Sequence, residues 1–421
     1  MKINDIVEAQ RKRKPRQLNR SVSMPPAKPG RTEHPFKGLL VGDSVERYGD
    51  QLDEGARIQH AEDVVFWEGS KGAARALEGL RNMGDKGSKD VSIKFDGSPA
   101  IIFGRDEVSG EFVLTDKSGF GAKGYDGKAK SGRELQKMLH NRKLSKGQEI
   151  PPSYKQFAGK MRRIFDAYEK AVPLDHSGYF KGDLLYFEKP DLVDGNWVFT
   201  PNIVTYTVDA NSDIGKRIAR STSGVVIHNE VNEDGVESPL TIDANDYFLS
   251  NEVLVFPPVL IQKPPKVKDD SIRDLKALIS KSAGPIDSLL NRDKLLELKI
   301  ADLPTVFYTY TNKKVDTGMQ NLGRDFLKWL STSKVSAPKQ KRMAEYIDQN
   351  MAGFKALWQV VAGIQSVKDD IINQLDSQDA DVKASIGDAP GGEGYVLSHP
   401  EGAIKLVNRA GFTAANRAIA R

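Results

Sequence analysis

Residues 91–100 read VSIKFDGSPA, a short strand pattern that ends in a lysine and is followed at once by an aspartate and a glycine. The first residues favour a strand that reaches Lys94, and Gly97 favours a turn. Two interpretations of Lys94 are open. It is a solvated charge where a strand meets a turn, or it is an amine that attacks a phosphate. The rest of the chain has to decide between them.

Further strand patterns surround this stretch. Residues 100–105 (AIIFGR) and 111–118 (EFVLTDKS) predict two strands joined as a hairpin. Strand signals return in four later segments, at 178–188, 196–201, 203–210 and 223–231. Short strands separated by turn residues predict a mostly antiparallel sheet.

Helical periodicity appears at 58–83, 131–171 and about 265–385. The last segment begins after the proline-rich FPPVLIQKPPKV (256–267), which is typical of a linker, and strand signals return in 391–412. We therefore predict an α+β fold whose antiparallel core is interrupted by a large helical insertion. The predicted units are a basic arm (1–50), the first part of the core (51–264), the insertion (265–384) and the closing strands (385–421).

The positive charge of the chain is concentrated at its beginning. The formal net charge is +5, and residues 1–33 alone hold nine Lys/Arg and three Asp/Glu. With almost no apolar residues to pack, this arm is predicted to be disordered. Two interpretations are open for it: contact with nucleic-acid phosphates, or a solvated tail without a specific partner.

Several classes of protein are disfavoured by composition. Cysteine is absent, which excludes disulfides, thiolate zinc sites and cysteine nucleophiles and fits a reducing cytoplasm. The six histidines are scattered without a zinc spacing such as HxxxH. No apolar run is long enough for a membrane span, and the N-terminus has no secretory signal. GFGAKG (119–124) matches GxGxxG, but no second strand with an acidic end follows it, so a dinucleotide fold is not predicted.

Five short motifs carry the functional argument because of their order along the chain. Each lies on or beside a predicted strand: KFDGS at 94–98, KSG at 117–119, GDLLY at 182–186, EGYV at 393–396, and AIKL at 403–406. Taken singly, each lysine is more simply a surface residue and each acidic residue a turn residue. Only the ordered set favours a shared site.

In this order the motifs resemble the covalent nucleotidyltransferases, the superfamily of polynucleotide ligases and mRNA capping enzymes. That superfamily carries a KxDG nucleophile motif, a basic motif, an acidic motif on a later strand, an EG-aliphatic motif and a final strand lysine. The resemblance covers roughly 90–210 and 385–410. The chain also resembles uncharacterised proteins of large tailed phages, in which HAED precedes the lysine motif and KLVNRAGF closes the chain, which implies a phage-encoded protein in the host cytoplasm.

The resemblance implies that Lys94 attacks the α-phosphate of ATP, forms lysyl-AMP, and passes the AMP to a 5′-phosphate end before a 3′-hydroxyl seals the strand. Lysine can do this only when its amine is neutral. The triphosphate and departing pyrophosphate imply a divalent ion, Mg²⁺ or Mn²⁺. Nucleic acid is the implied partner, and no membrane is involved.

The other motif residues receive roles from the same resemblance. Gly97 lets the backbone approach the nucleotide, and Ser98 bonds the ribose or a phosphate. Asp96 orients Lys94 or binds metal, and Glu393 binds metal.

The remaining implied contacts come from later motifs. Asp183 holds a ribose hydroxyl, and Lys405, helped by Lys117, stabilises charge on the α-phosphate. Tyr206 is the candidate aromatic that stacks on the base, with Phe199 second.

Three departures from the pattern narrow the type of enzyme. Pro99 stands where DNA ligases and capping enzymes commonly have an arginine, and Asp183 stands where glutamate is more common. Only 16 residues follow Lys405, too few for the OB-type domain that usually follows. The KxDGS form and the short segment after Lys405 favour an RNA-ligase-like enzyme, with the helical insertion as a substrate clamp or lid. Pro99 and Asp183 instead keep a non-catalytic protein on the same fold open as an alternative.

Two alternatives stay open at this point. One is a capping-type or other nucleotidyltransferase, and the other is a non-catalytic phage nucleic-acid-binding or virion protein on the same fold.

Overall fold

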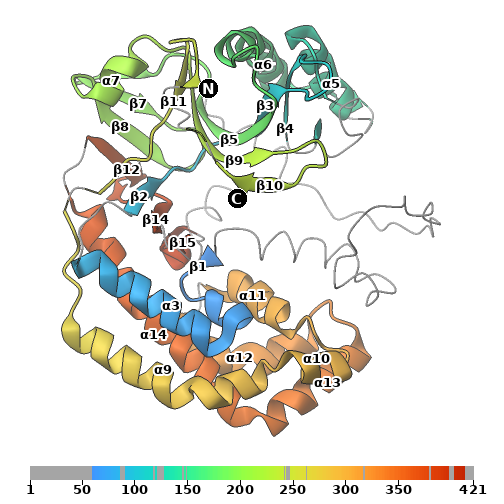
Figure 1. Ribbon diagram of the computed structural model, residues 1–421, viewed down its shortest axis with the longest axis vertical. Coiled ribbons are helices and arrows are strands. Elements are labelled where there is room, and N and C mark those ends of the chain that lie inside the picture. The colour runs from blue at the N-terminus through green and yellow to red at the C-terminus, as the bar shows by residue number, and fades with distance from the viewer. Residues whose placement is uncertain are drawn as a thin grey trace.

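Three sheets and a layer of helices make up the part of the chain that the structure describes (Figure 1). In this computed structural model the described residues are 59–412 apart from 86–90, 117–118, 121–127, 145–146, 148, 241, 243–246, 262, 316–317, 379–380 and 398–402. The predicted basic arm, Lys117 and most of the GFGAKG loop lie outside the described residues.

Sheet A brings strands from the two ends of the described chain together. Its order is β1-β15-β14-β2. Strand β1 (Gln59–His60) runs parallel to β15 (Ile404–Leu406), while β14 (Gly394–Leu397) runs antiparallel to both β15 and β2 (Val91–Lys94). The first and last predicted motifs therefore lie in one sheet.

Sheet B is built around the predicted hairpin and has the order β10-β9-β5-β3-β4, with β11 also paired to β9. Its strands are β3 (Ala100–Arg105), β4 (Phe112–Asp116), β5 (Gly178–Tyr186), β9 (Ser223–Val231), β10 (Glu237–Pro239) and β11 (Val253–Val255). Helices α5 (Gly132–Leu144) and α6 (Pro152–Ala171) cover one face, where Phe103 and Phe180 of the sheet share a core with Phe165 and Tyr168 of α6. Helix α6 begins with a proline, whose fixed φ suits the first helical position.

Sheet C has the order β13-β12-β8-β7-β6 and joins the middle of the chain to its end. Its strands are β6 (Asp191–Val193), β7 (Asn196–Phe199), β8 (Thr205–Asp209), β12 (Val382–Ile386) and β13 (Ala389–Pro390). The short helix α7 (Asp213–Ile218) follows β8, capped where the Ser212 hydroxyl accepts a hydrogen bond from the Gly215 amide at 3.0 Å. Phe95, next to Lys94, packs with Tyr206 and Phe256 in the core beside this sheet.

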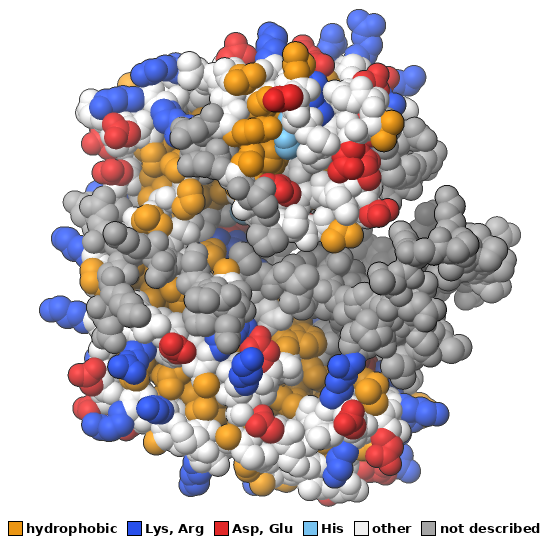
Figure 2. All heavy atoms as spheres, viewed as in Figure 1, with side chains coloured by type: hydrophobic (Ala, Val, Ile, Leu, Met, Phe, Trp, Pro, Cys, Tyr) orange, Lys and Arg blue, Asp and Glu red, His pale blue; other side chains and the backbone are white. Residues whose placement is uncertain are grey.

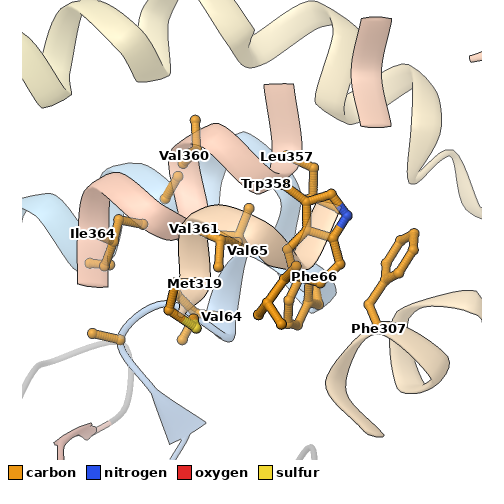
Figure 3. Close-up of a cluster of buried hydrophobic side chains, with 14 of the residues drawn as sticks. Val64, Val65, Phe66, Phe307, Met319, Leu357, Trp358, Val360, Val361 and Ile364 are labelled. Carbon is orange, nitrogen blue, oxygen red and sulfur yellow. The ribbon is translucent and has the colours of Figure 1, made fainter. Parts of the chain in front are cut away.

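The helical layer lies below the sheets in Figure 1. It consists of α3 (Val64–Asp85), α9 (Asp269–Leu289), α10 (Arg292–Glu297), α11 (Leu303–Lys314), α12 (Met319–Ser331), α13 (Ala337–Gln349) and α14 (Met351–Asp376). Figure 3 shows side chains of α3, such as Phe66, gathered with Trp358 of α14 and Phe307 of α11. These large buried rings supply much of the apolar surface that holds the layer together.

The α+β architecture with antiparallel sheets confirms the coarse prediction, but the helical segment is less separate than predicted. Helix α3, which the sequence assigned to the core, packs against α9 and α14. The same buried cluster continues into Val91, Tyr395 and Leu406 of sheet A. The helices from Asp269 to Asp376 therefore share one core with α3 and with one face of sheet A. Strand β12 starts at Val382, inside the segment predicted to be helical, and belongs to sheet C.

The described helices include none that is long and apolar enough to cross a membrane. On the face drawn in Figure 2, basic and acidic side chains are interspersed over the described surface rather than gathered by sign. The excess of basic residues in the sequence falls in 1–33, which the structure does not describe.

Candidate active site

The site begins with the pairing of β2 and β14. Lys94 lies opposite Gly394 in this antiparallel pair, and the ammonium of Lys94 donates to the carboxylate of Glu393. These two side chains are 19% and 18% exposed, so the pair is mostly buried but reachable from solvent. Gly394 has a φ of 140° and its backbone lies against Leu406 of β15 so closely that a Cβ would clash. A glycine is therefore required directly after Glu393.

Sheet A has one polar and one apolar face. Side chains alternate along a strand, and paired residues point to the same side. The register therefore places Lys94, Val396 and Lys405 on one face. Their neighbours Ile93 and Tyr395 point to the other face, which packs on the helical layer. The two predicted lysines thus share a face across three adjacent strands.

Asp96 is buried directly after the strand that ends in Lys94. Its Oδ1 accepts a hydrogen bond from the Asn202 amide at 3.0 Å, and its Oδ2 accepts one from the Ile203 backbone N–H at 3.3 Å. Burial and, next, the negative charge of Glu393 raise the pKa of Asp96 to about 6. Both carboxylate oxygens of Asp96 already accept hydrogen bonds. Asp96 is therefore better suited to fixing the turn after Lys94 than to binding a metal ion.

The turn at Gly97 is held against the strand that carries Asp183. The Ser98 N–H donates to the Leu184 carbonyl at 2.8 Å, and the Leu184 N–H donates to the Pro99 carbonyl at 3.1 Å. A Cβ at position 97 would lie 2.6 Å from the Asp183 Cβ, so only glycine permits this approach. Asp183 also lies 3.0 Å from the Nε2 of His228 on β9, a partner that the sequence analysis did not anticipate.

The prediction that Tyr206 stacks on a base is wrong in this structure. Tyr206 is 0% exposed, and its ring packs against Phe95 and Phe199. Its hydroxyl instead accepts a hydrogen bond from the Asp96 backbone N–H at 2.6 Å. Phe199, the second candidate, is also buried. Both rings pack in the core beside Phe95, under the turn that follows Lys94. Neither ring has an exposed face on which a base could stack.

The carboxylates of the predicted site converge around the same hydroxyl. Burial raises the pKa of Tyr206 well above its usual value, and the charges of Asp96, Glu393 and Asp183 raise it further. Lys94, Asp96, Asp183 and Glu393 are brought together from three separate parts of the chain, through the Lys94–Glu393 pair and the close approach of Gly97 to Asp183.

A metal would have to be held by few protein ligands. Among the described residues no group of three or more His, Cys, Asp or Glu side chains is arranged to hold an ion. Mg²⁺ commonly binds through one or two carboxylates, completed by phosphates and water. Glu393 fits that arrangement, and Asp96, with both oxygens bonded, fits it less well.

Besides His228, the sequence analysis assigned no role to three residues that the structure places at the site. Asn202 anchors Asp96, Val396 lies between the two lysine-bearing strands, and His60 lies beside Lys405. A signal for Val396 was present, because it sits two residues after Gly394 and must share its face. Asn202 lies in a loop, where no periodicity could have indicated it.

One comparison with known proteins gave a match. A family model described as a family of unknown function (DUF6267) matches residues 56–421. No curated protein and no solved structure matches the chain significantly. The matched range takes in every residue of the site described above and leaves out the whole predicted basic arm (1–50).

Proposed function

The chain belongs to this family of unknown function, DUF6267, and we propose that it is an ATP-dependent, RNA-ligase-like polynucleotide ligase that forms lysyl-AMP on Lys94. The observation that carries the proposal is the arrangement of sheet A. Lys94 and Lys405 lie on one face, Glu393 contacts Lys94, and Asp96 and Asp183 lie beside the turn that follows. These residues lie up to 311 positions apart in the sequence. The motif resemblance implies that they belong to one site.

The chemistry that follows from this arrangement has three transfers. The Lys94 amine attacks the α-phosphorus of ATP, a P–N bond forms, and the bond to pyrophosphate breaks. A 5′-phosphate oxygen then attacks the same phosphorus, which releases the lysine and leaves AMP on the strand. Finally, a 3′-hydroxyl attacks the 5′-phosphorus and AMP departs.

The residues of this chain prepare the first transfer. The ammonium of Lys94 donates a hydrogen bond to Glu393 in this structure. An attacking amine needs a free lone pair. The Lys94–Glu393 ion pair therefore has to separate, and the ammonium has to lose a proton, before the attack. Lys405 supports the negative charge that develops on the α-phosphate. Asp183 would accept a hydrogen bond from a ribose hydroxyl through the oxygen that does not contact His228. A divalent ion held by Glu393 and the phosphates would neutralise charge on the triphosphate.

The test is covalent labelling. The protein is incubated with α-³²P-labelled ATP and Mg²⁺, denatured and separated by electrophoresis. We expect label on the wild-type chain and none on Lys94→Ala. Lys339→Ala is the matched control, because Lys339 also pairs with a carboxylate, at 2.7 Å from Asp302, and its side chain is 23% exposed, but it lies in the helical layer. This control should keep the label.

Other results of the same experiment point elsewhere. Label from GTP but not from ATP would favour a capping-type transferase. No label from either nucleotide would contradict the proposal and favour a non-catalytic role on the same fold. The acceptor is then tested with 5′-phosphorylated RNA and DNA strands, and we expect the RNA ends to be joined faster.

A further inference from the structure

A histidine that the proposed chemistry leaves unused lies on the polar face of sheet A. His60 of β1 is registered with Lys405 of β15, which is in turn registered with Val396 of β14. Because paired residues point to the same side of a sheet, His60 shares its face with Lys405 and with Lys94 on the far strand. Three strand spacings, roughly 14 Å, separate β1 from β2.

The ring of His60 has an unmet hydrogen-bonding need. Its Nδ1 is buried and has no hydrogen-bond partner in the part of the chain that the structure describes. A buried polar atom without a partner costs free energy, so native proteins usually satisfy it with protein, water or ligand.

Charged groups of both signs lie near this imidazole. Lys405 is registered beside it, while Arg409 and Lys368 are paired with the buried carboxylates of Glu62 and Asp63. Burial lowers the pKa of His60 well below its usual value, and the positive charges of Arg409, Lys368, Lys405 and Lys94 lower it further. The ring is therefore neutral near pH 7, with one nitrogen that donates and one that accepts. A neutral N–H donor beside the ammonium of Lys405 suits an anionic oxygen better than it suits a cation.

An unpartnered nitrogen alone does not make a site. His176 also has a buried nitrogen, Nε2, without a partner among the described residues, but it lies against Phe180 and Tyr247 in the sheet B core, away from Lys94. His60 differs because its register places it beside Lys405, on the face that carries the nucleophile. This difference makes His176 a matched control.

We propose that His60 is a phosphate-contacting residue that binds the pyrophosphate end of the nucleoside triphosphate. This assignment rests on the proposed function, which supplies the direction from which Lys94 attacks. In phosphoryl and nucleotidyl transfer the attacking and leaving groups lie roughly in line. Lys94 attacks from β2, and Lys405 on β15 lies between β2 and β1. The phosphates that extend toward β1 are therefore those of the departing pyrophosphate. The Nδ1–H of His60 donates to a phosphate oxygen there.

The first arm of the test measures binding without the covalent step. Calorimetric titration of inorganic pyrophosphate with Mg²⁺ uses Lys94→Ala, which cannot react. Adding His60→Ala should weaken binding about tenfold or more, the usual effect of losing a hydrogen bond to a charged group. His60→Asn, whose amide takes the place of Nδ1, should lose less, and His176→Ala should lose nothing. Equal affinity with and without His60, or no pyrophosphate binding at all, overturns the proposal.

The second arm separates the two sources of phosphate. Wild-type chain and His60→Ala are first converted to lysyl-AMP at saturating ATP, and transfer to a 5′-phosphorylated strand is followed in a single turnover. We expect the same transfer rate for both. A slower transfer with unchanged pyrophosphate affinity would assign His60 to the strand phosphate and overturn the nucleotide assignment.

The outcomes also separate this inference from the proposed function. Wild-type chain that forms no lysyl-AMP contradicts the ligase proposal, whereas pyrophosphate binding that depends on His60 would still support the phosphate site. A label that forms normally with unchanged pyrophosphate affinity in His60→Ala contradicts the inference alone. Thermal unfolding of His60→Ala and His60→Asn establishes that both variants are folded.

Discussion

Two groups of charged side chains lie at opposite edges of sheet A and differ in how deeply they are buried. At the β1 edge, Glu62 accepts from Lys368 at 2.8 Å and from Arg409 at 3.0 Å, and Arg409 also donates to Asp63 at 2.8 Å. The side chains of this group are 0–4% exposed. At the β2 edge, Lys94 pairs with Glu393 where solvent still reaches both. We call these the buried cluster and the reactive pair.

The difference separates a structural role from a chemical one. The buried cluster ties α14, the turn after β1 and the segment after β15 together, and its own side chains are almost entirely closed to solvent. The reactive pair is partly open to solvent, which the proposed function requires if a nucleotide is to enter and Glu393 is to change partners. The buried cluster therefore fixes the strand that carries Lys405, while the reactive pair is available for transfer chemistry.

The largest expected effect comes from breaking the buried cluster. Lys368→Met leaves Glu62 buried with one cation fewer, and removing one partner of a buried ion pair typically costs about 3–5 kcal/mol. Urea unfolding should therefore report a loss of that size in the free energy of unfolding. A loss below about 1 kcal/mol would mean that the cluster is hydrated and that the contrast with the reactive pair does not hold.

The second prediction concerns the pH dependence of stability. Burial raises the pKa of Asp96 to about 6 from its ordinary value of 3.8, so the folded state holds a proton that the unfolded state releases. Stability from this group is fully present below about pH 4 and is lost as the pH rises through 6, by up to about 3 kcal/mol. Asp96→Asn should remove this contribution, so its unfolding free energy should fall less than that of the wild type between pH 4 and 6. Parallel curves for the two proteins would contradict the burial of this carboxyl.

The third prediction tests the corrected role of Tyr206. Tyr206→Phe keeps the ring but leaves the Asp96 backbone N–H without its acceptor, at a cost of about 1–3 kcal/mol in the free energy of unfolding. The apparent affinity for ATP in the labelling reaction should change less than twofold, because the ring does not contact a base. A selective loss of ATP affinity at unchanged stability would restore the stacking role.

The smallest expected effect on stability comes from the reactive pair itself. Lys94→Met should change the free energy of unfolding by about 1 kcal/mol, since Glu393 can hydrate when its partner is removed. Activity should nevertheless be lost completely. A destabilisation as large as that of Lys368→Met would place the reactive pair among the structural contacts.

Much of the fold could be predicted from local pattern. The strands around 91–116, 178–231 and 391–412 and the helices of 131–171 and 269–376 lie where periodicity indicated them, but β12 (Val382–Ile386) begins within the segment predicted to be helical. The sharing of one core by α3 and the later helices could not be read locally, because it depends on contacts such as Phe66 with Trp358 across the whole chain.

The candidate site was predictable in part. We expected Lys94, Asp183, Glu393 and Lys405 to share a site only because their ordered motifs resemble those of a known superfamily. The spacing of the motifs along the chain does not by itself predict their distances in the fold. Tyr206 was misjudged although a signal existed. In TYTVD, Tyr206 and Val208 alternate with threonines, so the tyrosine belongs to the buried face of β8. The burial of Glu62 and Asp63 could not be predicted, because charged side chains are rarely buried unless they are paired. Their partners, Lys368 and Arg409, are distant in the sequence.

Intact-mass spectrometry tests the central claim most directly. The wild-type chain, Lys94→Ala and Lys339→Ala are each incubated with unlabelled ATP and Mg²⁺, and the adduct is mapped by proteolysis under conditions that preserve phosphoramidates. The account predicts a mass increase of one AMP on the wild type and on Lys339→Ala, located on Lys94, and none on Lys94→Ala. An unmodified wild-type chain, or an AMP adduct on any residue other than Lys94, would contradict it.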